Sequence, residues 1–213
     1  MIWTNFAKDK FLAPHVSALT ECRARPLELV GGQPEKWLPG FVLNSMLRVS
    51  WTEPARQLAF MIVRRVDAAV REYEAGRAEL EAFVDQGSQL GIQRYSRGLM
   101  HFETCVGATF QAWMLVRQLS TLSREVPEEE PKLFEEDDGT DIQRLNSLYN
   151  TSKHADERIV RGHFAPDSTL PIWIVNEGLA AVDCHLSFAE LADLLKALAR
   201  ISHDLAYPPP GAA

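Results

Sequence analysis

One uninterrupted helical repeat in the middle of the sequence constrains the fold more than any other feature. Between residues 92 and 122, apolar side chains recur at spacings of three and four on two faces. The first stripe is Ile92, Tyr95, Leu99, Phe102, Val106, Phe110 and Trp113, and the second is Cys105, Ala108, Ala112, Leu115, Leu119 and Leu122. A helix that is apolar on two sides lies at the centre of its bundle. The pattern predicts a central helix over residues 89–124, with Phe102, Phe110 and Trp113 buried.

Three further helices are predicted from periodicity and from capping residues. The first begins at Thr52-Glu53-Pro54 and carries apolar residues at helical spacing to residue 85, before Gly87. The second begins at Thr140 and continues to residue 161, and the last covers 187–207 before Pro208-Pro209-Pro210. The last two starts carry capping-box residues, Thr140 with Gln143 and Ser187 with Glu190.

The remaining segments complete a mainly α architecture. Residues 1–50 contain many prolines and glycines, so we expect a short helix near 8–23 and then irregular chain, packed through Trp37, Phe41, Val42 and Leu47. The β-rich run that starts at Leu170, with a turn at Asn176-Glu177-Gly178, predicts a β-hairpin over 169–184. The expected fold is a single domain over 1–207. It is an up-and-down helical bundle of four to five helices with a small β-hairpin before the C-terminal helix, and a disordered tail over 208–213.

The net charge of −7 belongs to one loop. Residues 125–138 hold eight acids and one lysine, whereas the rest of the chain carries 21 acids and 21 bases. A proline-containing acidic run repels itself and resists burial. We therefore interpret 125–139 as a solvated acidic connection. Because the rest of the chain is neutral, the total charge does not exclude binding to nucleic acid.

Composition and motifs exclude several classes of protein. No apolar run approaches the roughly 18 residues of a membrane span, and the N-terminus does not resemble a signal peptide, so we expect a cytoplasmic protein with no membrane partner. Three widely spaced cysteines argue against a disulfide framework or a cysteine-built zinc site. The sequence also lacks a phosphate-binding glycine loop, a His-Glu-x-x-His pair and a repeated Glu-x-x-His pattern. We expect no cofactor and no metal.

One polar stripe on the helix that begins at Thr140 carries the residues that could take part in a reaction. Asn150 and His154 are four apart, which places both on one face of a continuous helix. A histidine can take a proton from a ribose 2′-hydroxyl or give one to a leaving oxygen, and an asparagine can orient the imidazole. Lys153 would supply positive charge for a phosphodiester.

At this helix the chain resembles the HEPN superfamily. Those helical bundles of prokaryotic defence and toxin systems carry an Arg-Asn-x-x-x-His type motif on a late helix, and here the matching hexapeptide runs from Tyr149 to His154. Tyr149 occupies the position of the arginine. The resemblance, over residues 52–161, implies an RNA-binding or RNA-cleaving protein, in the second case a metal-independent endoribonuclease, whose two sites meet across a homodimer. Its catalytic residues would be His154 and Asn150, and its substrate-binding residues Arg97, His101, Lys153 and Tyr149.

A second interpretation remains open from the same residues. The stripe can be a structural feature of a non-catalytic interaction module, again most readily a homodimer. A shared basic cleft between His154 and its symmetry mate would favour the nuclease, and its absence would favour the module.

Overall fold

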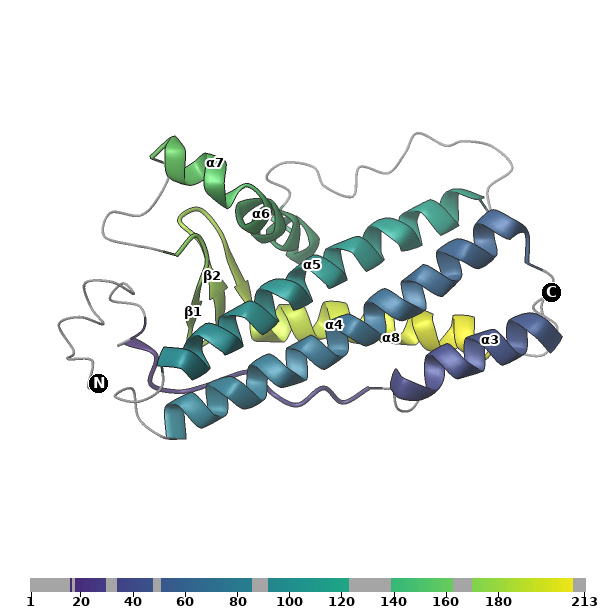
Figure 1. Ribbon diagram of the computed structural model, residues 1–213, viewed down its shortest axis with the longest axis horizontal. Helices are drawn as coiled ribbons and strands as arrows, with labels where there is room; N and C mark the ends of the chain where they lie inside the picture. The colour runs from purple at the N-terminus through teal and green to yellow at the C-terminus, as the bar shows by residue number, and fades with distance from the viewer. Residues whose placement is uncertain are drawn as a thin grey trace.

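The computed structural model describes residues 16, 18–29, 34–47, 51–85, 92–122, 139–162 and 170–208. These residues form a mainly α fold with a small antiparallel sheet before the last helix, as the sequence predicts (Figure 1). The elements in chain order are η1 (Pro34–Lys36), α3 (Trp37–Leu47), α4 (Glu53–Asp85), α5 (Ile92–Leu122), α6 (Asp141–Lys153), α7 (Ala155–Val160), β1 (Trp173–Val175), β2 (Gly178–Ala180), β3 (His185–Ser187) and α8 (Phe188–Ala206). Among the described helices, none has the length and apolarity that a membrane crossing requires.

The long helices α4 and α5 run antiparallel along the length of the molecule, and α8 lies against them (Figure 1). Phe102 of α5 is fully buried between them, in edge contact with Tyr73 of α4 and tilted contact with Phe188 of α8, at centroid distances of 5.7 and 4.9 Å. The central position expected for this helix is confirmed over its first half. Phe110 and Trp113 are only partly buried, because the second half of α5 is covered on fewer sides.

The N-terminal region differs from the irregular chain expected over 1–50. Residues 37–47 form the helix α3, in which Pro39 is the third residue, where a backbone N–H has no partner within the helix. Gly40 lies directly under the Tyr207 ring, where an added Cβ would stand 2.5 Å from the ring and the exposed Tyr207 side chain would have to move. Trp37 and Phe41 are buried as expected, whereas Val42 is exposed. Residues 19–29 have no regular secondary structure, so the predicted helix does not reach residue 23, and residues 8–15 lie outside the described part.

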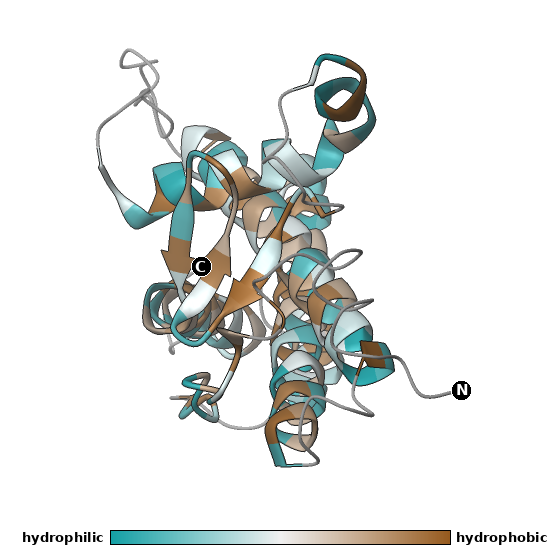
Figure 2. Ribbon diagram, turned by 90° about the vertical axis from the view of Figure 1, so that its left-hand side faces the viewer, coloured by the Kyte–Doolittle hydropathy of each residue, from teal (hydrophilic) through white to brown (hydrophobic). Residues whose placement is uncertain are grey.

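The sheet has a third strand that the sequence pattern did not predict. Its order is β1-β2-β3, and Leu179 at the centre pairs with Ile174 on one side and Leu186 on the other. All three side chains are buried, and Figure 2 shows the sheet standing at one end of the bundle. At Gly178 an added Cβ would lie 2.2 Å from the Leu186 carbonyl oxygen, so the chain there accepts only glycine.

The helix expected over 140–161 is interrupted. It divides at His154 into α6 and α7, with backbone angles of φ −109° and ψ 27° at the break. The backbone N–H of His154 still donates to the Asn150 carbonyl, at 3.0 Å, so the interruption is a local turn. The acidic segment 125–138 and the tail from residue 209 lie outside the described residues.

Candidate functional site

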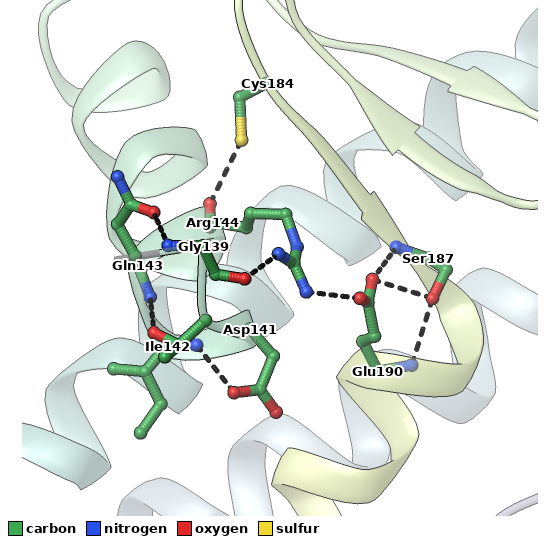
Figure 3. Close-up of polar contacts among 9 residues, drawn as sticks. Gly139, Asp141, Ile142, Gln143, Arg144, Cys184, Ser187 and Glu190 are labelled. Carbon is green, nitrogen blue, oxygen red and sulfur yellow. Dashed lines mark hydrogen bonds and ion pairs between the residues drawn. The ribbon is translucent and has the colours of Figure 1, made fainter. Parts of the chain in front are cut away.

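Helix α6 carries the candidate motif, and polar contacts at its first turn hold it in place (Figure 3). The Thr140 hydroxyl accepts from the Gln143 backbone N–H at 3.2 Å, and the Gln143 side chain accepts from the Gly139 N–H at 3.0 Å. The Arg144 guanidinium donates to the Gly139 carbonyl and pairs with Glu190 of α8. The start of α6 is therefore tied to the start of α8.

Glu190 is the centre of this arrangement. Its carboxylate accepts from the Ser187 backbone N–H and hydroxyl, both at 2.8 Å, and completes the capping box of α8. Burial opposes the charged form, but the hydrogen bonds from Ser187 and the Arg144 guanidinium outweigh burial and lower the pKa of the Glu190 carboxyl. The ion pair is therefore a fixed structural link.

His154 lies at the turn between α6 and α7, and its side chain is 45% exposed. Its Nδ1 is 3.7 Å from the Glu157 carboxylate, a loose ion pair of neighbouring turns. The Asn150 side chain donates instead to the Asn146 side-chain oxygen, at 3.1 Å. Within the described residues, no hydrogen bond joins the Asn150 side chain to the His154 imidazole; the two residues are linked only through the backbone, where the His154 N–H donates to the Asn150 carbonyl. The asparagine therefore does not orient the imidazole in this arrangement.

Tyr149 is partly buried and packs toward α5. Its ring stacks on Phe110 of α5 at a centroid distance of 4.2 Å and an interplanar angle of 15°. It continues the apolar face of α6 formed by the buried Leu145 and Leu148. Tyr149 therefore packs α6 on α5. An arginine at this position would replace a ring that packs against α5.

The other candidate phosphate contacts fall into two separated groups. Lys153 is exposed beside His154. Arg97 and His101 face α4, where the Arg97 Nε is 3.6 Å from Glu79 and the His101 Nδ1 is 2.6 Å from Glu72.

His101 and Phe110 are nine residues apart on α5, which is about two and a half helical turns, so their side chains leave the helix on opposite sides. Phe110 contacts α6 through Tyr149. The structure thus brings Asn150, Lys153 and His154 near one another but does not bring Arg97 and His101 to them. In the part of the chain that the structure describes, no three His, Cys, Asp or Glu side chains gather as a metal site would require.

A feature that the sequence did not predict is an exposed apolar surface at the opposite end of the bundle. Three hollows of about 400, 430 and 330 Å³ adjoin there, because the first shares Val42 and Met46 with the second, and Gln57 and Met61 with the third. We call the residues that line them the α3 surface. They are Leu38, Pro39, Phe41, Val42, Leu43, Ser45 and Met46 of α3, Pro54, Arg56, Gln57, Leu58, Phe60 and Met61 of α4, and Gln118 and Leu122 of α5. The one sequence signal for this surface was the helical spacing of apolar residues across 38–46. Pro39 and Gly40 argue against a helix there and so obscure that signal.

Comparison with protein-family models, with curated proteins and with solved structures finds no match to this chain.

Proposed function

We propose that this chain is a non-catalytic interaction module that forms a homodimer through the α3 surface. The observation that supports the proposal is the exposure of large apolar side chains there. Met46 is 79% exposed, Leu43 58%, Leu122 52% and Val42 44%. Large contiguous apolar surface on a folded protein marks a site of interaction, and a contact with another protein is one such site.

The chemistry of the α3 surface favours a second copy as its partner. Among the described residues that line it, the only charged one is Arg56, which already pairs with Glu53 of the same helix. A two-fold contact sets the same surface against itself, so like charges would repel, and this surface has almost none. Methionines and aromatic residues, which are enriched in interfaces, fill much of it.

The size of the α3 surface indicates the strength of the dimer. Fifteen of the described residues line the hollows, fewer than the roughly 20–30 per side of a standard interface. We therefore expect a dissociation constant on the order of micromolar, since 1 μM corresponds to about 8 kcal/mol of binding.

Sedimentation velocity of wild type and two methionine variants tests the proposal. Met46→Glu places a carboxylate in the contact, and burying it unpaired costs about 2 kcal/mol or more in each copy. The dissociation constant should rise about a thousandfold, because every 1.4 kcal/mol is about tenfold. Met100→Glu is the matched control, because Met100 is an exposed methionine of α5 outside the α3 surface. A wild type that is monomeric at 100-fold above the expected micromolar constant, or equal dimers of all three proteins, would contradict the proposal.

RNA binding or cleavage in the manner of the HEPN resemblance is the second candidate function. The observation in its favour is that the His154 side chain is 45% exposed and lies beside the exposed Lys153. His154→Ala should then abolish metal-independent cleavage of single-stranded RNA with no change in melting temperature. If wild type leaves RNA uncut and unbound, this candidate fails while the homodimer proposal stands.

A further inference from the structure

A second cavity, distinct from the α3 surface and from the motif helix, lies over the first turns of α8. It has a volume of about 730 Å³, within the range of roughly 300–1,000 Å³ typical of small-molecule sites. Its walls come from residues 21–26, from Tyr73 of α4 and from Glu177 in the β1–β2 turn. We call it the α8 pocket. Nothing in the proposed homodimer makes use of it.

The wall formed by residues 21–26 is held at both ends. On the sheet side, the Asn176 side chain accepts from the Thr20 backbone N–H at 3.0 Å, and the Asn176 carbonyl accepts from the Arg23 N–H at 3.1 Å. On the helix side, the Leu27 N–H donates to Glu74 at 2.7 Å, and the Tyr73 hydroxyl donates to the Arg25 carbonyl at 3.1 Å. The pocket is therefore preformed, which lowers the entropic cost of binding.

The charges that line the pocket are mostly satisfied by one another. Arg23 lies between Glu177, at 3.0 Å, and Glu21, whose carboxylate its Nε reaches at 2.8 Å. Lys196 pairs with Asp193 at 3.2 Å. Arg25 differs, because no carboxylate in the described residues lies within ion-pair distance of its guanidinium. The lining holds three acids and three bases and is neutral as a whole, and the exposed Arg25 is the cation in it that remains open to an anionic group of a ligand.

The rest of the lining sets the size and character of a ligand. Tyr73, Phe188 and Ala192 provide an apolar and aromatic floor. The three carboxylates of the lining would repel a dianion such as a phosphate monoester, whereas a single guanidinium can hold one carboxylate through two parallel hydrogen bonds. We infer that the α8 pocket binds a small monocarboxylate with an apolar body, and that Arg25 is its counter-ion.

Three isosteric probes test this inference by isothermal titration calorimetry. Benzoate has the inferred charge, benzamide is its neutral analogue and benzylamine is a cation of similar shape. Benzoate should bind saturably with one site per chain and at least tenfold more tightly than benzamide, and benzylamine should not bind. Equal heats from all three probes, or no benzoate binding at millimolar concentration, would overturn the inference.

Two variants locate the binding. Arg25→Gln should weaken benzoate binding at least tenfold, whereas Arg200→Gln, which changes an exposed arginine of α8 outside the pocket, should leave it unchanged. Ala189→Trp adds a large side chain at an exposed position of the lining and should reduce benzoate binding by a similar factor. If benzoate binds both Arg25→Gln and Ala189→Trp as it binds wild type, the α8 pocket is not its site.

Discussion

Substitution of Tyr149 separates a packing role from a catalytic one, because this residue stands at the arginine position of the HEPN-type motif. Its ring stacks on Phe110 and closes the contact between α6 and α5. If packing is its role, Tyr149→Arg lowers stability and creates no activity. If the motif is nucleolytic, the same change supplies the missing cation and raises RNA cleavage.

The magnitude follows from the burial of the ring. Truncating a fully buried Phe to Ala costs about 3–5 kcal/mol, and a half-buried ring should cost about half as much. The lost stacked contact adds about 1 kcal/mol, so Tyr149→Ala should cost about 2.5–3.5 kcal/mol in total. In Tyr149→Arg, the aliphatic stem and a guanidinium over the Phe110 ring recover about 1 kcal/mol, which leaves a loss of about 1.5–2.5 kcal/mol.

Urea unfolding followed by far-ultraviolet circular dichroism measures these losses. Tyr149→Phe is the control, because the hydroxyl makes no hydrogen bond within the described residues, and its stability should lie within about 0.5 kcal/mol of wild type. A stability of Tyr149→Ala equal to that of wild type would refute the packing role. A gain in RNA cleavage by Tyr149→Arg would restore the catalytic interpretation of the motif.

Three further predictions concern the elements that position the sites. Phe102→Ala should cost about 4 kcal/mol of unfolding free energy, because three helices surround the cavity that the lost ring would leave. Met100→Ala, at an exposed position of the same helix, should cost less than about 0.5 kcal/mol. Urea unfolding measures both, and equal losses would contradict a central α5. Gly178→Ala should cost more than about 3 kcal/mol or prevent folding, since its Cβ would meet the Leu186 carbonyl, and a wild-type melting temperature would disprove that close approach. The Glu190 pKa is lowered in the folded protein, so its carboxylate stabilises the fold above the pKa of the unfolded chain, and this contribution disappears as the pH falls through the folded pKa. Glu190→Ala should therefore cost about 1–2 kcal/mol at neutral pH and progressively less on acidification, and a pH-independent difference would argue against a charged cap.

Long apolar periodicity predicted the long helices well, because burial of an amphipathic face dominates their stability. Tyr149 follows Leu145 by four residues, a spacing that predicts one shared helix face, and the structure has Tyr149 packed on the core beside Leu145. The prediction of one helix that continues through His154 was wrong. A sequence signal for the second start did exist, because Asp156 and Glu157 are acids typical of a first helical turn.

Other features depend on tertiary contacts that periodicity does not report. Helix α3 contains Pro39 and Gly40, and it forms because Trp37 and Phe41 bury against the bundle and because Pro39 falls in the first turn. The strand β3 has three residues, too few for an alternation, and exists by pairing with β2. The separation of His101 from His154 depends on which side of α5 receives α6, which no local pattern encodes.

Hydrogen–deuterium exchange at two protein concentrations tests the central proposal most directly, because it locates the contact between copies. If the chain dimerises through the α3 surface, raising the concentration from well below to well above the dissociation constant should slow exchange in peptides that cover 37–47. Peptides that cover Lys153 and His154 should exchange at the same rate at both concentrations. Protection at 150–160 with none at 37–47 would contradict the proposal and place the dimer contact at the motif helix instead.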